Sequence, residues 1–342
     1  MKENFMNPSP LTTQIDLGGM QHIVIFIGLS IGALVWFIKM SHVSVAARLL
    51  LAYLLVYTLF MLEYPHAIFG DWTTAYRAQA GQTLAEFMFT ACACVFIMPY
   101  IERLLKYVVG FVLVCVWLGE PGILGAISFQ TAFCALAIPF LPLPLSVLVV
   151  VTALTHHGST ALLIIGAQCF AVALKHPKFN KATPFVIAAL YTSAYYMSGA
   201  MFDGGERLAK YSKFMTYLFT KWEWIIFGVG PGTFTWTSIL LDEYKAPLFL
   251  QMHSDWLQIF WELGAVGFAL SVFLFGQTVK RAWNRTYLLA ATLGAGAFMA
   301  TYYPLRHYPT ALLTVYIFLT VELSYKEDSI VTRLLSSRRQ GR

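Results

Sequence analysis

Several side chains that could bind a ligand or take part in a reaction lie in one stretch, from His253 to Gly267. It reads His-Ser-Asp-Trp-Leu-Gln-Ile-Phe-Trp-Glu-Leu-Gly-Ala-Val-Gly. Ser254 or Asp255 can cap the helix that follows. Asp255 and Glu262 are seven positions apart in the sequence, so their carboxylates share one helix face, about 10 Å apart along the axis. Glu262 falls inside an apolar run, where an ionisable group faces the protein interior and is a functional residue by default.

A glycine-rich segment precedes this stretch and reads Gly228-Val229-Gly230-Pro231-Gly232-Thr233-Phe234. Glycines at every second position permit tight turns and close backbone approach. The segment is neither a phosphate loop, because no Lys-Ser/Thr follows, nor a dinucleotide-binding fingerprint, because Thr233 stands at the third glycine position. By itself it predicts a turn. In the later stretch, Gly264 and Gly267 are expected to let another helix come close.

Side chains that could hold an anion or move a proton occur near both segments. They are Arg207, Lys210, His253, Arg306 and His307. Arginine grips phosphate oxygens in a two-pronged fork, and lysine does so as a point charge. Histidine titrates near neutral pH and is the usual general base. The alternative interpretation is structural: such cations contact lipid headgroups, and a lone histidine at a membrane interface is a polar anchor.

No cluster of Asp, Glu and His has the spacing of a metal site, and the five cysteines, Cys92, Cys94, Cys115, Cys134 and Cys169, all fall in apolar runs. We therefore expect no metal and no cofactor, and cysteines that pack between helices.

The elements that carry these residues are predicted to be membrane spans. Of the 342 residues, 58% are hydrophobic and 12% are charged, against about 25% charged in soluble domains. Lipid must then be the outer solvent for most of the chain. We predict an all-α, polytopic bundle of about eleven spans, within a range of 10–12. They cover residues 20–40, 44–62, 82–100, 104–119, 123–141, 143–156, 159–174, 184–201, 256–279, 286–303 and 310–325.

Lysine and arginine positions predict the orientation, with the N-terminus outside and the C-terminus inside. Residues 1–201 are N-terminal spans, 202–255 a long periplasmic loop with the catalytic and donor-binding elements, 256–325 C-terminal spans and 326–342 a basic cytoplasmic tail. The loop at 202–255 breaks the positive-inside trend, and long loops are often functional. The net charge of +6 follows from the positive-inside rule and does not indicate nucleic acid.

The two segments together resemble the O-antigen ligase and O-antigen polymerase superfamily of membrane glycosyltransferases, which includes pilin glycosylation ligases. Its hallmark, His-Asn/Ser-x-aromatic-Leu followed by Glu-x-Gly-x-x-Gly, matches the stretch that begins at His253. Its Gly-x-Gly-x-Gly-x-Phe element matches residues 228–234, and Lys210 stands where the family more often has Arg. Residues 303–309, Tyr-Pro-Leu-Arg-His-Tyr-Pro, are similar to its short outer turn. The resemblance covers about residues 205–325 and is architectural before that.

The resemblance implies a GT-C-like fold in the bacterial inner membrane with its active site facing the periplasm. The reaction moves a glycan from undecaprenyl diphosphate to an acceptor hydroxyl, such as that of lipid A core, without a metal and with inversion. His253 would be the general base, and Arg306 would bind the negative charge of the diphosphate. Substrate-binding roles fall to Arg207, Lys210, Gly228, Gly230, Gly232, Asp255, Glu262 and His307.

Other functions remain open at this point. A polysaccharide polymerase or a protein O-oligosaccharyltransferase of the same superfamily would use the same donor and another acceptor. A transporter would place ionisable groups near the midplane of its spans, whereas here the polar residues gather in one outer loop. A non-catalytic membrane protein is the remaining alternative, because the first 200 residues are plain apolar spans.

Overall fold

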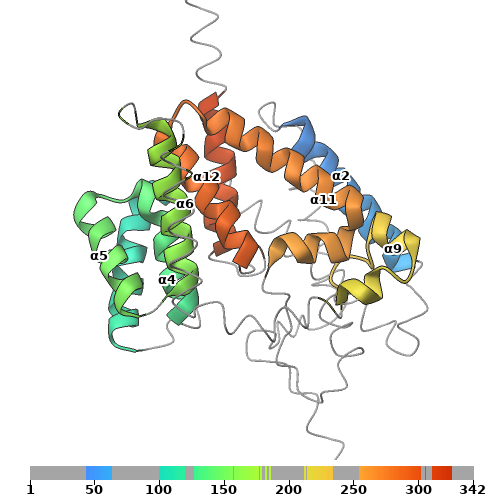
Figure 1. Ribbon diagram of the computed structural model, residues 1–342, viewed down its shortest axis with the longest axis horizontal. Coiled ribbons are helices and arrows are strands. Elements are labelled where there is room, and N and C mark those ends of the chain that lie inside the picture. Colours follow the sequence, from blue (N-terminus) through green and yellow to red (C-terminus); the bar gives the residue numbers. More distant parts are fainter. Residues whose placement is uncertain are drawn as a thin grey trace, which may run out of the picture.

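In the computed structural model every regular element is a helix among the residues that the structure describes (Figure 1). These residues are 44–63, 100–119, 127–156, 158–176, 178, 182, 185, 212, 214–233, 254–301, 305 and 310–325. The prediction of an all-α chain is confirmed for this part. The predicted spans 20–40, 82–100 and 184–201 lie almost entirely outside it.

The helix bounds follow the apolar runs closely. The helices are α2 (Val45–Glu63), a helix over 100–117, α4 (Ile127–Ala137) with the 3-10 turn η2 (Ile138–Phe140), α5 (Leu143–Thr155), α6 (Ser159–Lys175), α9 (Trp222–Phe227), α11 (Asp255–Ala282), α12 (Thr286–Thr301) and Thr310–Tyr325. Proline at the start of η2 and of α5 suits the first turn, where its missing N–H has no helical partner. Among these helices only α11 is long and apolar enough to cross a membrane by length and composition, and the other apolar stretches have 10–17 residues.

The main core lies between α4, α5, α6, α12, the helix over 100–117 and Thr310–Tyr325. Small side chains let these helices approach closely. Among them are Ala132, Ala135, Ala161, Ala291 and Ala295, all at most 1% exposed. The amide of Gln168 on α6 donates to the carbonyl of Ala135 on α4 at 2.9 Å, which fixes that contact.

The outer faces of several helices are apolar and exposed. Val56 on α2 is 66% exposed, Phe111 in the helix over 100–117 is 54% exposed, and Leu143 and Leu154 on α5 are 77% and 57% exposed. Water-soluble monomers rarely leave such large apolar areas uncovered. These outer faces are therefore apolar, as the core is.

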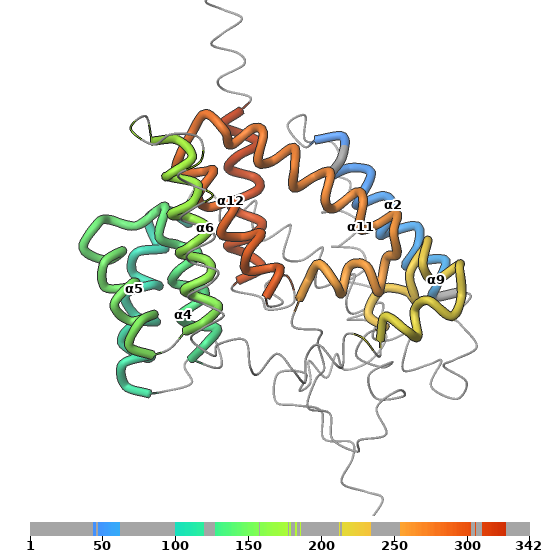
Figure 2. Tube along the Cα trace, viewed as in Figure 1, coloured from blue at the N-terminus to red at the C-terminus, as the bar shows by residue number. Residues whose placement is uncertain are grey.

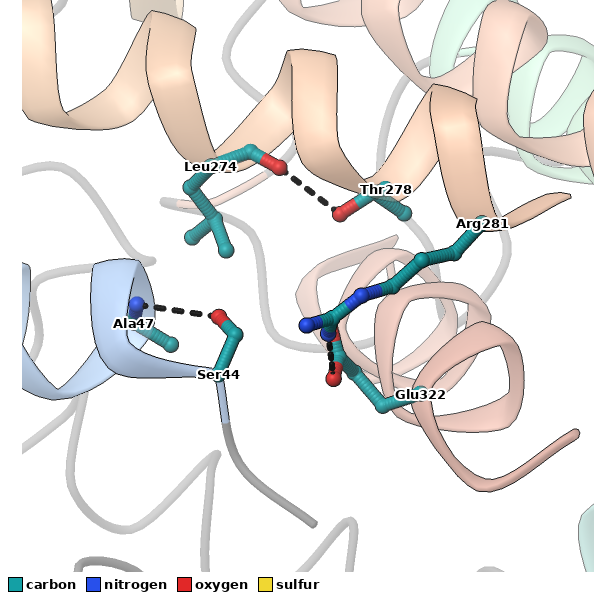
Figure 3. A network of polar contacts seen from close by, with 6 residues as sticks. All are labelled: Ser44, Ala47, Leu274, Thr278, Arg281 and Glu322. Carbon is teal, nitrogen blue, oxygen red and sulfur yellow. Dashed lines mark hydrogen bonds and ion pairs between the residues drawn. The ribbon is translucent and has the colours of Figure 1, made fainter. Parts of the chain in front are cut away.

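One end of the bundle collects cations. Arg281, near the end of α11, forms an ion pair with Glu322, and in the view of Figure 3 the start of α2, at Ser44, lies beside this end of α11. Arg281 also lies 5.2 Å from the ring of Tyr325, and Lys175 at the end of α6 lies 4.0 Å from the ring of Trp283. With the N-terminus outside, the predicted spans 159–174 and 256–279 both end inside, so Lys175 and Arg281 are expected on the cytoplasmic side.

Candidate active site

The break in α11 shapes the opposite end. Gly264 has φ 63° and ψ −166°, so the helix bends there (Figures 1 and 2). Residues 255–263 run crosswise, and the rest of α11 continues along α2 as far as Ala282. The sequence predicted one straight span over 256–279. The helix Asp255–Ala282 covers that span, and the feature that the sequence did not predict is the interruption at Gly264, where glycine adopts a positive φ.

The glycine segment fills the break. The amides of Val229 and Gly230 donate to the carbonyls of Trp261 and Glu262 at 2.8 and 3.1 Å. In an unbroken helix these carbonyls would accept from amides four residues further on. A helix interruption is stable only when such groups find other partners. The non-helical segment at 228–230 therefore completes the hydrogen bonding of the bent helix.

Backbone contact between the two glycine motifs is reciprocal. A Cβ added at Gly228 would overlap the backbone of Glu262 and Leu263, and one added at Gly264 would overlap that of Ile226 and Gly228. Gly228 also has φ 86°, a conformation that other residues rarely adopt. The sequence predicted that Gly264 would let another helix come close, and the neighbours are the end of α9, at Ile226, and the glycine turn that follows it.

The turn itself is the predicted one. Gly230 and Gly232 have φ values of 120° and 74°. The hydroxyl of Thr233 donates to the carbonyl of Gly230 at 2.5 Å, and its amide donates to the same carbonyl at 3.2 Å. All residues from Gly228 to Thr233 are buried, so this is a packed internal turn.

Two tyrosines of α2 clamp both motifs, and sequence reasoning missed them. The single hydroxyl hydrogen of Tyr53 is shared between the carbonyls of Phe227 and Leu263, whose oxygens lie 3.1 and 3.0 Å from the hydroxyl oxygen. The hydroxyl of Tyr57 donates to the carbonyl of Gly228 at 2.6 Å. The two rings stack at 5.6 Å. The available signal was a pair of phenols four residues apart on an apolar helix, where each hydroxyl needs a partner.

An aromatic cluster supports the crosswise part of α11. Phe214, Leu218, Trp224, Val229 and Trp261 are buried together. The ring of Tyr217 stacks on those of Trp224 and Trp261 at 5.2 and 6.3 Å. Burial raises the pKa of the Tyr217 phenol above its ordinary value. The cluster joins the segment before the glycine turn to the helix of the hallmark stretch.

The start of α11 is bonded to α12 and to Leu305, which follows α12 in the sequence. Ser254, one of the two cap residues that the sequence allowed, is the N-cap and accepts from the amide of Leu257 at 3.4 Å. Trp256 Nε1 donates to the carbonyl of Gly296 at 3.2 Å. Asp255 is 2% exposed, and its Oδ2 accepts from the amide of Leu305 at 2.8 Å. A charge-assisted bond of this kind is strong, and it joins segments 50 positions apart in the sequence.

Glu262 lies on the same face as Asp255, as predicted, and is 4% exposed. Its Oε1 accepts from Gln258 Nε2 at 2.9 Å. The other amide atom, Gln258 Oε1, is buried and has no hydrogen-bond partner among the residues that the structure describes. This buried face therefore carries two carboxylates and an amide oxygen, which are groups that can accept hydrogen bonds from hydroxyls.

Half of the predicted site residues are among those that the structure describes. Gly228, Gly230 and Gly232 form the turn at the bend of α11 beside Glu262, and Asp255 lies at the start of the same helix. His253, Arg306, Arg207, Lys210 and His307 lie outside the described residues. In the sequence, His253 is two positions before Asp255, and Arg306 directly follows Leu305. Within the described part of the chain, no group of three or more His, Cys, Asp or Glu side chains could hold a metal ion.

Comparisons with known proteins give no match: no family model matches the chain, and no curated protein or solved structure is significantly similar to it.

Proposed function

We propose that this chain is a multi-pass membrane glycosyltransferase of the O-antigen ligase type, which acts on the outer face of the bacterial inner membrane. It would transfer a glycan from undecaprenyl diphosphate to an acceptor hydroxyl such as that of lipid A core. The observation that carries the proposal is the hydrogen bond between Asp255 Oδ2 and the amide of Leu305 at 2.8 Å. This bond joins Asp255 to Leu305, which are two positions after His253 and one position before Arg306 in the sequence, and the proposed reaction needs these two segments together.

Two further observations support the membrane part. Large apolar side chains are exposed on α2, α5 and the helix over 100–117, as lipid-facing surfaces require. Lys175 and Arg281 occupy one end of the bundle, while Ser254 and Leu305 occupy the other. This separation agrees with the positive-inside rule. The long loop and the α11 start then belong to the periplasmic side.

The proposed reaction uses two kinds of side chain. The imidazole of His253 takes the proton of the acceptor hydroxyl as that oxygen attacks the anomeric carbon of the donor sugar. The new bond joins acceptor oxygen to sugar, and the bond that breaks joins sugar to diphosphate, which leaves on its lipid with the electron pair. Attack from the face opposite the diphosphate inverts the linkage. Arg306, Arg207 and Lys210 bind the diphosphate charge as it grows.

The described residues would hold these groups in place. Asp255 links the α11 start to the outer turn, and Gly228 and Gly230 fix the bend on which Glu262 lies. Glu262 and Gln258 would accept hydrogen bonds from sugar hydroxyls. Pre-positioned groups of this kind contribute to catalysis because they need no rearrangement during the reaction.

The test is glycan transfer in liposomes with purified protein, a lipid-diphosphate-linked glycan and separate acceptors: lipid A core, a single lipid-linked repeat and a pilin peptide. Each acceptor corresponds to one activity of the superfamily. His253→Ala should lose about 10²–10⁴-fold in single-turnover transfer and keep donor binding. The matched control is His176→Ala, which changes a histidine at the end of α6. Wild-type protein inactive with every acceptor, or a fully active His253→Ala variant, would refute the proposal.

A further inference from the structure

The segment before the glycine turn carries an exposed apolar patch of four side chains, Phe219, Trp222, Ile226 and Phe227. Their exposed fractions are 57%, 64%, 37% and 44%. Trp222 and Ile226 are four residues apart on α9, so they share one helix face. Isolated exposed apolar residues are ordinary, but four within nine positions form a surface that requires an apolar neighbour.

The opposite side of the same segment is anchored in the protein. Leu218 and Trp224 are at most 2% exposed and belong to the aromatic cluster around Trp261. The patch therefore cannot turn inward without opening that cluster. Lys221 stands next to the patch, with its ammonium 4.5 Å from the ring of Trp224. Aromatic side chains beside a lysine are typical of segments that lie at a membrane surface.

The segment that carries the patch contacts α2, which has an exposed apolar face of its own. The carbonyl of Phe227 accepts from the hydroxyl of Tyr53 on α2 at 3.1 Å, and α9 lies beside α2 (Figures 1 and 2). Further along α2, Val56 and Leu59 are 66% and 54% exposed. If α2 faces lipid, the adjoining patch meets the same lipid near the end of that helix.

We infer that the patch inserts into the outer leaflet of the bilayer, with Trp222 among the acyl chains just below the headgroups. The inference rests on the membrane-spanning part of the proposed function and is independent of the reaction. It changes the expected place of this segment from an aqueous loop to the membrane surface. The glycine turn and the bend at Gly264, which are bonded to this segment, would then be held at the level of lipid headgroups, where the diphosphate of a lipid-linked donor lies.

The experiment measures the depth of three single cysteines in a variant whose five native cysteines are replaced. Trp222→Cys, Glu223→Cys and Leu148→Cys are each labelled with an environment-sensitive fluorophore and placed in phospholipid nanodiscs. Glu223 is the exposed polar neighbour of Trp222, and Leu148 is 44% exposed on α5, a predicted span. The fluorescence of each label is quenched in two ways: by lipids that carry a nitroxide on the part of the acyl chain near the headgroup, and by iodide in the aqueous phase.

The label at 222 should be quenched several-fold more by the lipid nitroxide than the label at 223, and several-fold less by iodide. Iodide quenching at 222 equal to that at 223 would overturn the inference. Protection of 222 from both quenchers would also overturn it, because protein would then cover the patch. A label at 148 that lipid nitroxides do not reach would refute the membrane assignment itself, which separates that failure from the others.

Discussion

The backbones of the segments at Gly228 and Gly264 lie in direct contact. A Cβ added at Gly228 would overlap the backbone next to Gly264, and a Cβ added at Gly264 would overlap the backbone of Gly228. Gly264 ends the crosswise part of α11, and Gly228 begins the turn whose next amides bond to Trp261 and Glu262. The two glycine motifs of the chain are therefore one structural unit. The need for glycine at each position comes from the backbone of the other segment.

Alanine at either glycine should destabilise the protein. Gly228→Ala and Gly264→Ala combine a strained positive φ, about 1–3 kcal/mol, with overlap against backbone, and thermal unfolding in detergent should report a clear fall in Tm. The double variant should cost less than the sum, because the first change already displaces the shared contact. Gly276→Ala on the same helix is the control, since a Cβ there meets nothing within 4 Å. A Tm for Gly228→Ala equal to that of this control would contradict the interpretation.

Tyr57→Phe removes one hydroxyl and leaves the buried carbonyl of Gly228 without its 2.6 Å hydrogen bond. Leaving such a group unpaired costs about 1–3 kcal/mol. We expect a lower Tm, measured in the same detergent assay. Tyr107→Phe is the matched control, because Tyr107 is 67% exposed and surface changes usually stay within about 0.5 kcal/mol. Equal stability of the two variants would remove Tyr57 from the clamp.

Asp255→Ala should slow glycan transfer while the helices persist. The carboxylate holds the amide of Leu305, and loss of a charge-assisted hydrogen bond costs about 1.5–3 kcal/mol, or roughly ten- to a hundredfold in rate. The effect should appear as a lower kcat, because the variant releases the segment at Leu305 but keeps the cations that are proposed to bind the donor. Asp255→Asn should recover part of the rate, since its amide oxygen still accepts. Glu223→Gln, an exposed acidic change on α9, should leave kcat unchanged, and loss of activity there would point to a general charge effect.

Arg306→Ala should weaken donor use by roughly ten- to a hundredfold, and Arg306→Lys should restore only part of it, because lysine cannot grip two phosphate oxygens in a fork. Transfer rates across donor concentrations measure this.

Transfer should also persist in EDTA, since cations of the chain would bind the diphosphate charge. Complete loss of transfer in EDTA, restored by Mg²⁺ or Mn²⁺, would show that a metal carries it instead.

The apolar runs predict most of the described helices to within a few residues. Span 143–156 is helix Leu143–Thr155, and span 159–174 is helix Ser159–Lys175. The helix predicted at 104–119 begins earlier, at residue 100, and ends at 117. Local signals suffice here because a continuous apolar helix satisfies its own backbone groups. The same reasoning predicted the cap at Ser254 and the turn at Gly228.

The bend at Gly264 and the clamp by Tyr53 and Tyr57 were decided by tertiary structure alone. Glycine is compatible with both a straight helix and a positive φ, so its conformation depends on whether a partner takes up the released carbonyls. That partner, the turn at 228–230, is distant in the sequence, and the tyrosines that hold it are 171 and 210 positions from their acceptors Gly228 and Leu263. Such pairings have no local pattern, because they depend on which segments the folded bundle brings into contact.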